Sequence, residues 1–343
     1  MRLRTECTRS RLSWLLPWHE PGIQRRRTEM AEKIVIALGG NALQSGKGPA
    51  TAEAQLEVVK NTCKRVAEIS SMGYEIAVVH GNGPQVGRIV MASEAARDVT
   101  PAMPFDVCGA MSQGYIGYHI QQCLRYALNM QNRHVPVVTV ATQVVVDEND
   151  PAFKNPTKPI GPFYTEEEAK ELEKEKGWTM KEDAGRGWRR VVASPKPVRI
   201  VEIDSVKQLW DDNIVITCGG GGIPVLERMD GHMDGVAAVI DKDFAAELLA
   251  EQIRADMLMI LTEVEKVAIN FNKPDQQDLD HMTLLDGVKY IEEGQFPAGS
   301  MLPKVEAAMK FVRQFPSKKA IITSLDKAVE ALAGETGTVI TFN

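Results

Sequence analysis

The feature that most constrains the fold is a series of short, almost continuously apolar runs separated by amphipathic stretches. The apolar runs lie at 33–38, 75–79, 135–140, 214–217, 257–262, 319–323 and 338–341. Runs of this length without alternating polar residues are typical of strands that are covered on both faces. Helices are predicted between them, at about 52–71, 111–129, 243–254, 303–314 and 326–333. This order predicts an α/β fold, in which helices cover both faces of a mainly parallel sheet.

Residues 151–190 interrupt this order. The segment is rich in charged residues and proline, and one short helix is predicted within it at about 165–176. It is either a solvated surface excursion or a small protruding subdomain that covers a site, since long inserted loops often act as lids. We expect such a lid-like subdomain over about 151–200.

The composition excludes several classes of protein. The chain has a net charge of -6, whereas a nucleic-acid backbone requires a basic face on its partner. No apolar run is long enough to span a bilayer. The five cysteines include no CxxC pair and the six histidines show no metal-ligand spacing. We therefore expect reduced thiols in a cytoplasmic protein, with no metal site that can be predicted from side chains.

Residues 1–29 differ from the rest of the chain. They contain seven arginines, no lysine and three acidic residues, so this segment is basic while the remainder is acidic. We expect it to be an extension, with an alternative start at Met30, that does not fold with a domain spanning 30–343. An arginine-rich transit peptide is the alternative interpretation.

Three of the predicted strands end in glycine-rich turns, "GGNA" at 39–42, "HGNGPQVG" at 80–87 and "CGGGGIPV" at 218–225. The first turn is similar to a Walker A loop, but five residues instead of four separate Gly40 from Gly46. Gly48 also stands where that loop requires Ser or Thr. Backbone amides of glycine-rich turns at the carboxyl ends of parallel strands can bind anions. Three such turns at one edge predict an anion site of another kind.

Two lysines stand at the predicted starts of helices, Lys242 and Lys304. A cation there opposes the helix dipole unless an anion lies nearby. The residues before them also have ordinary structural roles, because Asp241 is a suitable N-cap and Pro303 is common in a first helical turn. A third lysine, Lys158, lies in the protruding segment, where a solvated side chain is the default. These lysines are candidates for neutralising phosphate charge.

From Met30 onward the chain resembles the carbamate kinases of the amino acid kinase family. The resemblance rests on "ALGGNAL", "HGNGPQVG", "KPIGPFY", "RRVVASPKP", "CGGGGIPV", "VIDKDFAAELLA", "TEVEKVAINF" and "GSMLPKVEAA". It implies an open αβα sandwich that usually assembles as a homodimer. It also implies reversible phosphoryl transfer between carbamoyl phosphate and ADP, which yields ATP and carbamate, with magnesium bound to the nucleotide. This reaction commonly ends the arginine deiminase pathway, and carbamate then decomposes to ammonia and carbon dioxide.

The resemblance also implies roles for individual residues. Lys242, Lys304 and Lys158 would act on the transferred phosphoryl group, and Asp241 would hold the lysines in place. The nucleotide base would lie near Val267 and Asn270. Backbone amides would bind the phosphate and the carbamate, and they belong to Gly39, Gly40, Asn41, Gly81, Asn82, Gly83, Gly219 and Gly220.

The chain departs from the family pattern at Leu302, where the pattern has glycine. A leucine could not adopt a glycine-only torsion without strain. Either the torsion at this position is ordinary, or the loop is displaced and Lys304 with it.

Two other functions stay open. One is the phosphorylation of a longer carboxylate substrate by a related kinase, and the other is nucleotide sensing by a relative that has lost catalysis. Loss of a catalytic lysine would favour the second, and all three lysines are present.

We predict that a protein beginning at Met30 is as soluble and as active as the full chain, because every family motif lies after the break in composition. The two proteins can be compared side by side for solubility and turnover. An insoluble or largely inactive shortened protein would show that residues 1–29 belong to the fold.

Overall fold

The computed structural model describes residues 31–44, 51–183 and 185–343, and the predicted extension at 1–29 lies outside them. Its largest sheet contains all seven predicted strands. In spatial order the strands are β15 (His281–Thr283), β17 (Thr338–Thr341), β16 (Lys319–Ser324), β12 (Met257–Thr262), β1 (Lys33–Leu38), β2 (Glu75–His80), β9 (Ile214–Ile216) and β3 (Val137–Thr139). Every neighbouring pair is parallel except β16 and β17. The predicted α/β fold with a mainly parallel sheet is confirmed.

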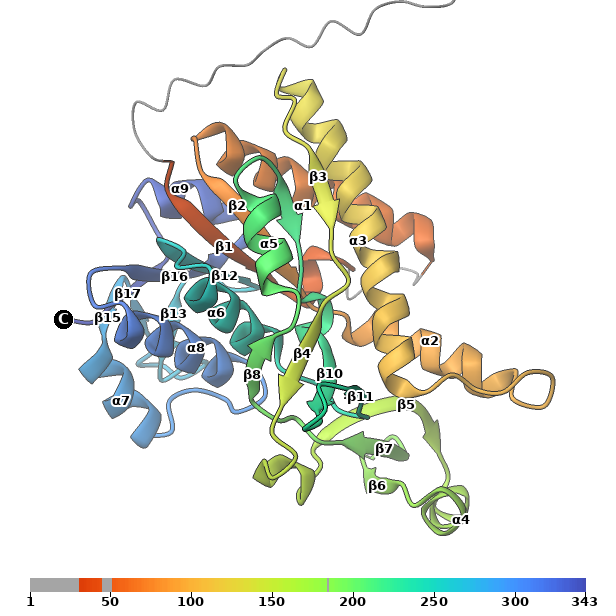
Figure 1. Ribbon diagram of the computed structural model, residues 1–343. Coiled ribbons are helices and arrows are strands. Elements are labelled where there is room, and N and C mark those ends of the chain that lie inside the picture. Colours follow the sequence, from red (N-terminus) through yellow and green to blue (C-terminus); the bar gives the residue numbers. More distant parts are fainter. Residues whose placement is uncertain (1–30, 45–50, 184) are drawn as a thin grey trace, which may run out of the picture. The chain divides into compact units, whose positions relative to one another are not determined.

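Helices cover both faces of this sheet, as Figure 1 shows. One face is covered by α1 (Ala52–Ser71), α3 (Phe105–Met130) and α9 (Ala328–Leu332). The other is covered by α5 (Ile203–Trp210), α6 (Lys242–Gln252) and α8 (Met301–Gln314), with α7 (Leu284–Glu292) packed on α8. Along β1, Ile34, Ile36 and Leu38 enter the first core, while Val35 and Ala37 enter the second. This double burial explains why the strand is apolar at every position.

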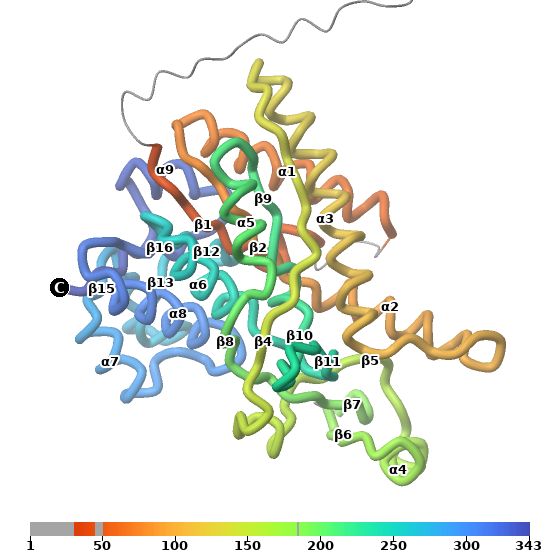
Figure 2. Tube along the Cα trace, viewed as in Figure 1, coloured from red at the N-terminus to blue at the C-terminus, as the bar shows by residue number. Residues whose placement is uncertain are grey.

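A second sheet was not predicted from the sequence. Its strands, in spatial order, are β11 (Met233–Gly235), β10 (Ile223–Glu227), β4 (Gln143–Val146) and β8 (Pro197–Ile200). The trace in Figure 2 runs from β3 directly into β4 and returns through β8 to α5 and β9. The second sheet therefore extends from the end of the main sheet at which the glycine-rich turns lie.

The predicted protruding segment forms a small subdomain of its own. Its antiparallel sheet consists of β5 (Lys158–Tyr164), β7 (Trp188–Val192) and β6 (Thr179–Glu182), and α4 (Glu166–Lys176) packs against it. The compact part thus spans 158–192, and we call it the lid subdomain. The predicted boundary near residue 200 lies too far along the chain, because β8 pairs with β4 of the second sheet.

The lid subdomain rests on α2 (Gly83–Ala95), below which it lies in Figure 1. Val86, Ile160 and Val192 are buried together between the two parts. Lys176 of α4 forms an ion pair of 3.2 Å with Glu94 of α2. Because α2 begins with the second glycine-rich turn, these contacts place β5 beside that turn.

The remaining pieces are short. A hairpin of β13 (Val267–Ile269) and β14 (Gln277–Leu279) follows β12. Within the described ranges, no helix is long and apolar enough to cross a membrane. Four cysteines there, Cys63, Cys108, Cys123 and Cys218, are buried free thiols.

Candidate active site

The three glycine-rich turns meet at one edge of the main sheet, because β1, β2 and β9 are parallel neighbours. The amide of Gly81 donates to the carbonyl of Leu38 at 3.2 Å, which joins the first two turns. A Cβ atom on Gly219 would lie 2.5 Å from Nε2 of His80, and one on Gly220 would lie 2.2 Å from Nδ2 of Asn82. Only glycine permits this approach of the third turn to the second.

Two cavities open beside these turns. The larger, of about 600 Å³, lies between the first turn, the end of β12 and the start of α8. The smaller, of about 370 Å³, lies between the second turn, the lid subdomain and the start of α6. Gly40, Lys242 and Lys304 line both cavities. These three residues therefore mark the place where a ligand in one cavity would meet a ligand in the other.

The two lysines are held by one buried carboxylate. Asp243 is 2% exposed, its Oδ1 accepts a hydrogen bond from Nζ of Lys242, and its Oδ2 lies 3.0 Å from Nζ of Lys304. Burial alone would raise the pKa of Asp243, but the two ammonium groups hold it below its usual value. The carboxylate therefore stays ionised and fixes two cations side by side.

Asp241 contacts one of the three lysines that it was expected to hold, Lys158. Its carboxylate caps α6, with Oδ1 accepting from the amide of Asp243 at 3.0 Å, and it forms an ion pair of 3.5 Å with Lys158. Asp243, two residues later, is the group that contacts Lys242 and Lys304. Sequence reasoning missed Asp243, although it is the second carboxylate of the "DKD" triplet.

Leu302 has an ordinary backbone torsion. It lies in the first turn of α8, its φ is not positive, and its side chain packs against the core. Helix α8 starts at Met301, two residues before the predicted start, so Lys304 stands at the end of the first helical turn. Nζ of Lys304 also donates to the carbonyl of Ser300 at 3.2 Å. The replacement of glycine by leucine therefore leaves Lys304 beside Asp243.

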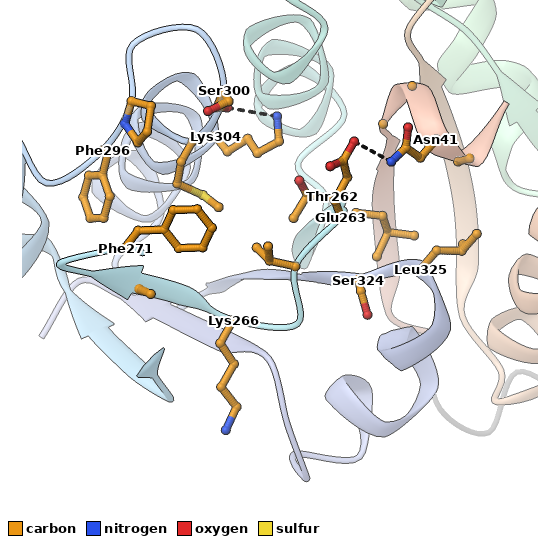
Figure 3. A pocket seen from close by; sticks show the side chains of 18 of the residues that line it. Asn41, Thr262, Glu263, Lys266, Phe271, Phe296, Ser300, Lys304, Ser324 and Leu325 are labelled. Atoms are coloured by element: carbon orange, nitrogen blue, oxygen red, sulfur yellow. Dashed lines mark hydrogen bonds between the residues drawn. The ribbon is translucent and has the colours of Figure 1, made fainter. Parts of the chain in front are cut away.

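Figure 3 shows the larger cavity, with Phe271 and Phe296 on one side and Asn41 and Glu263 on the other. The amide group of Asn41 donates to the carboxylate of Glu263. Lys266, Ala268 and Phe271 belong to the wall near β13. Val267 and Asn270, which were predicted to lie beside the nucleotide base, do not line this cavity. The side chain of Val267 points into the core with no exposed surface, because side chains alternate along a strand. Asn270 instead donates to Asp275 at 2.8 Å.

The other predicted residues lie close to the cavities. Gly39, Gly40 and Asn41 line the larger one, while Gly81, Asn82, Gly83, Lys158 and Gly220 line the smaller one. Gly219 is buried behind this wall, where its carbonyl accepts from the Gln113 amide at 3.0 Å. The wall of the smaller cavity carries four cationic side chains and two carboxylates, a net charge of +2. This charge suits a small dianion.

The side chain of His80 lies against the second and third turns. It ends β2, is buried, and its Nδ1 lies 2.8 Å from the carbonyl of Gly81, so Nδ1 is the protonated nitrogen of the neutral ring. Burial lowers the pKa of His80 from 6.5 to about 4, although the hydrogen bond to Gly81 opposes the shift. The ring is therefore neutral near pH 7.

The described residues contain no group of three or more His, Cys, Asp or Glu side chains that could hold a metal ion. The wall of the larger cavity includes two carboxylates, Glu263 and Asp326. Oxygen ligands of this kind suit Mg²⁺, which usually keeps several waters and takes its other ligands from phosphates. The residues present fit a magnesium ion that a nucleotide carries.

Comparisons with known proteins agree with this geometry. The model of the amino acid kinase family matches residues 32–324. A carbamate kinase of Clostridium perfringens is 59% identical over 90% of this chain and 99% of its own length. That of Pyrococcus horikoshii is 52% identical over 91% of this chain and 100% of its own. The solved structure of carbamate kinase from Giardia lamblia bound to AMP-PNP has a TM-score of 0.88 and 45% identity, over 91% of this chain and 99% of that one.

We predict that His80 makes the folded chain sensitive to acid. Its folded pKa of about 4 lies below the ordinary 6.5, so between these values the unfolded chain binds a proton that the folded chain does not. From this group alone, the free energy of unfolding should fall by about 2 kcal/mol between pH 7.5 and pH 5.

The measurement is urea unfolding of the parent and of His80→Asn at the two pH values. The stability advantage of the parent should shrink by that amount at pH 5. Other shifted groups are common to both proteins and cancel, such as Glu247, whose pKa burial raises to about 7. Equal losses in the two proteins would contradict the prediction.

Proposed function

The chain belongs to the amino acid kinase family and is a phosphotransferase, and we propose that the acceptor of its phosphoryl group is carbamate. The reaction would be reversible transfer between carbamoyl phosphate and ADP, giving ATP and carbamate. One observation carries the proposal: two cavities meet at Gly40 and at two lysines that share one buried carboxylate. Relatives named as carbamate kinases, at 52% and 59% identity over nearly the whole chain, support the choice of substrate.

The geometry suits an in-line transfer. A nucleotide in the larger cavity would place its terminal phosphate beside Gly40, Lys242 and Lys304, and carbamate in the smaller cavity would approach from the other side. The two ammonium groups would neutralise charge on the equatorial oxygens of the transferred group. Asp243 would act as a positioning residue, because it contacts both lysines and is itself buried. Positioning and charge neutralisation supply most of the catalysis in reactions of this type.

Magnesium would enter with the nucleotide. Bound to the phosphate oxygens, it would neutralise their charge, and Glu263 and Asp326 are the wall carboxylates that would hold its waters. Asn41, which donates to Glu263, would keep that carboxylate facing the cavity.

The lid subdomain would cover the carbamate. Its Lys158 lines the smaller cavity and forms an ion pair with Asp241 on the opposite wall. We expect hydrogen exchange across 158–192 to slow when nucleotide and a carbamate mimic are both bound. Unchanged exchange would mean that the subdomain is a fixed wall.

A homodimer is the proposed assembly. Helix α3 exposes Val107, Met111 and Tyr118 at spacings of four and seven residues, with Tyr126 further along. An exposed apolar stripe of this kind commonly marks a protein interface. Sedimentation analysis of the parent and of Tyr118→Lys tests this assembly, since the charge should weaken the dimer.

The physiological setting is also a proposal. Synthesis of ATP from carbamoyl phosphate would place the enzyme at the last step of the arginine deiminase pathway. A cytoplasmic location fits the four buried free thiols, since disulfides are rare in reducing compartments.

The test of the function is ATP formation by the purified protein from ADP, Mg²⁺ and carbamoyl phosphate. Phosphorylation of longer carboxylates, assayed in parallel, distinguishes the related kinases. Turnover with a longer carboxylate but not with carbamoyl phosphate would overturn the proposal. Nucleotide binding without any turnover would favour a sensing protein.

We predict that Lys242→Met lowers turnover by roughly 10²–10³-fold, because an aligned charge on the transferred group is lost. Affinity for ADP should change far less, since most of the larger cavity is untouched. The measurements are turnover, ADP titration and a melting curve.

Lys310→Met is the matched control. Lys310, on α8, also pairs with a buried carboxylate, with its Nζ 2.5 Å from Glu247, but it lines neither cavity. Both variants should therefore lose some stability, and only Lys242→Met should lose turnover. If turnover of Lys242→Met stays within about threefold of the parent, Lys242 does not act on the reaction.

A further inference from the structure

One cation in the wall of the smaller cavity has no role in the mechanism above. Arg189 of β7 lines that cavity with its side chain 20% exposed. Its Nη1 lies 3.3 Å from a carboxylate oxygen of Asp183, and its Nη2 donates to the carbonyl of Gly161 at 3.1 Å. Its guanidinium carbon also lies 5.1 Å from the centre of the Phe163 ring. The group is thus fixed by three contacts within the lid subdomain.

The guanidinium is only partly satisfied. Nε of Arg189 is buried and has no hydrogen-bond partner among the described residues. A guanidinium has five N–H donors, of which these contacts use two. Because Nε is fully covered, a ligand in the cavity would meet the two terminal nitrogens, and each of these has one N–H group that the contacts above do not use.

The other cations of the cavity are already paired with carboxylates that line it. Lys242 and Lys304 contact Asp243, and Lys158 contacts Asp241. These two carboxylates line the cavity themselves, whereas Asp183, the partner of Arg189, does not. Arg189 is therefore the cation of this wall whose carboxylate partner lies outside the cavity. Within the described part of the wall, no carboxylate pairs with its guanidinium, so an anion bound in the cavity can contact it.

We propose that Arg189 binds the carbamoyl end of the substrate and the carbamate formed from it. The inference rests on the proposed function. The phosphoryl group would lie where the cavities meet, so the rest of carbamoyl phosphate extends into the smaller cavity, which alone of the two includes Arg189.

The charge changes of the reaction favour this contact. In transfer to ADP, the bond between phosphorus and the carbamoyl oxygen breaks and its electron pair stays on that oxygen. A new bond forms between phosphorus and a terminal phosphate oxygen of ADP. Negative charge thus grows on the carbamate, and a planar guanidinium matches a carboxylate with two parallel hydrogen bonds. The contact strengthens as the reaction proceeds, which is the condition for lowering its barrier.

The chain offers a matched control in Arg186. This side chain shares two of the three partners of Arg189, with an ion pair of 2.8 Å to Asp183 and its guanidinium carbon 5.2 Å from the Phe163 ring. It is 62% exposed and lines neither cavity. A purely structural role of these arginines in the lid subdomain would affect Arg186 and Arg189 variants alike.

The experiment compares the parent with Arg189→Met, Arg189→Lys and Arg186→Met in ATP synthesis from carbamoyl phosphate. We expect Arg189→Met to lower kcat/KM for carbamoyl phosphate by roughly 10²-fold while KM for ADP stays within twofold. Arg189→Lys keeps the positive charge but loses the pair of parallel N–H donors, so its kcat/KM for carbamoyl phosphate should lie between those of Arg189→Met and the parent. Arg186→Met should have the same kcat/KM for carbamoyl phosphate as the parent. If both methionine variants lose activity equally, or if Arg189→Met retains the parental kcat/KM, the inference is wrong.

Binding of carbamoyl phosphate without nucleotide, measured by calorimetry, separates this inference from the proposed function. A parent that binds carbamoyl phosphate through Arg189 but forms no ATP would overturn the function and support the inference. An active parent whose affinity for carbamoyl phosphate is unchanged in Arg189→Met would overturn the inference alone. A parent that neither binds nor turns over carbamoyl phosphate would overturn both.

Discussion

The contact on which the candidate site depends is that of one buried carboxylate with two ammonium groups. Asp243 lies in the first turn of α6, while Lys304 comes from the first turn of α8. Without the carboxylate, two cations would lie close together in a largely buried place, where their repulsion is weakly screened. Without the cations, the carboxylate would be buried and unpaired, which is strongly destabilising. Asp243, Lys242 and Lys304, here called the triad, therefore fix the relative position of two helices and of the charges between the two cavities.

The main sheet brings the rest of the site to this triad. Parallel neighbours end at the same edge, so the turns after β1, β2 and β9 lie next to each other there, and α6 and α8 begin beside them. Glycine is required where the third turn approaches His80 and Asn82, because any Cβ atom would overlap their side chains. The lid subdomain adds Lys158 and Arg189 from the far side. Each cavity is thus formed by several segments distant in sequence.

Periodicity was sufficient to predict every strand of the main sheet except β15, and the helix predicted at 52–71 coincides with α1. It did not reveal the second sheet, whose strands are between 3 and 5 residues long. Within the site it identified the right segments but not always the right residue. Asp241 and Asp243 lie two residues apart, and only the fold shows which carboxylate reaches the lysines. Val267 and Ala268 are neighbours on a strand, but Ala268 lines the larger cavity while the side chain of Val267 is buried in the core. An error of one position therefore selects a core residue in place of one that lines the cavity. Arg189 escaped notice because nothing in "RRVV" distinguishes a lining arginine from a solvated one.

The central position of β1 also bears on how the chain acquires its structure. Ile34–Leu38 of β1 pair with Met257–Leu261 of β12, more than 200 residues later in the chain. During synthesis the first strand emerges from the ribosome long before this partner exists, and one side of it stays unpaired until β12 arrives. Long-range pairing of this kind slows folding and leaves an apolar edge open to aggregation. The turn at Gly40 and the lysines of α6 and α8 come together only when that gap in the sheet closes, so a nascent chain gains its phosphate site among the last steps of folding.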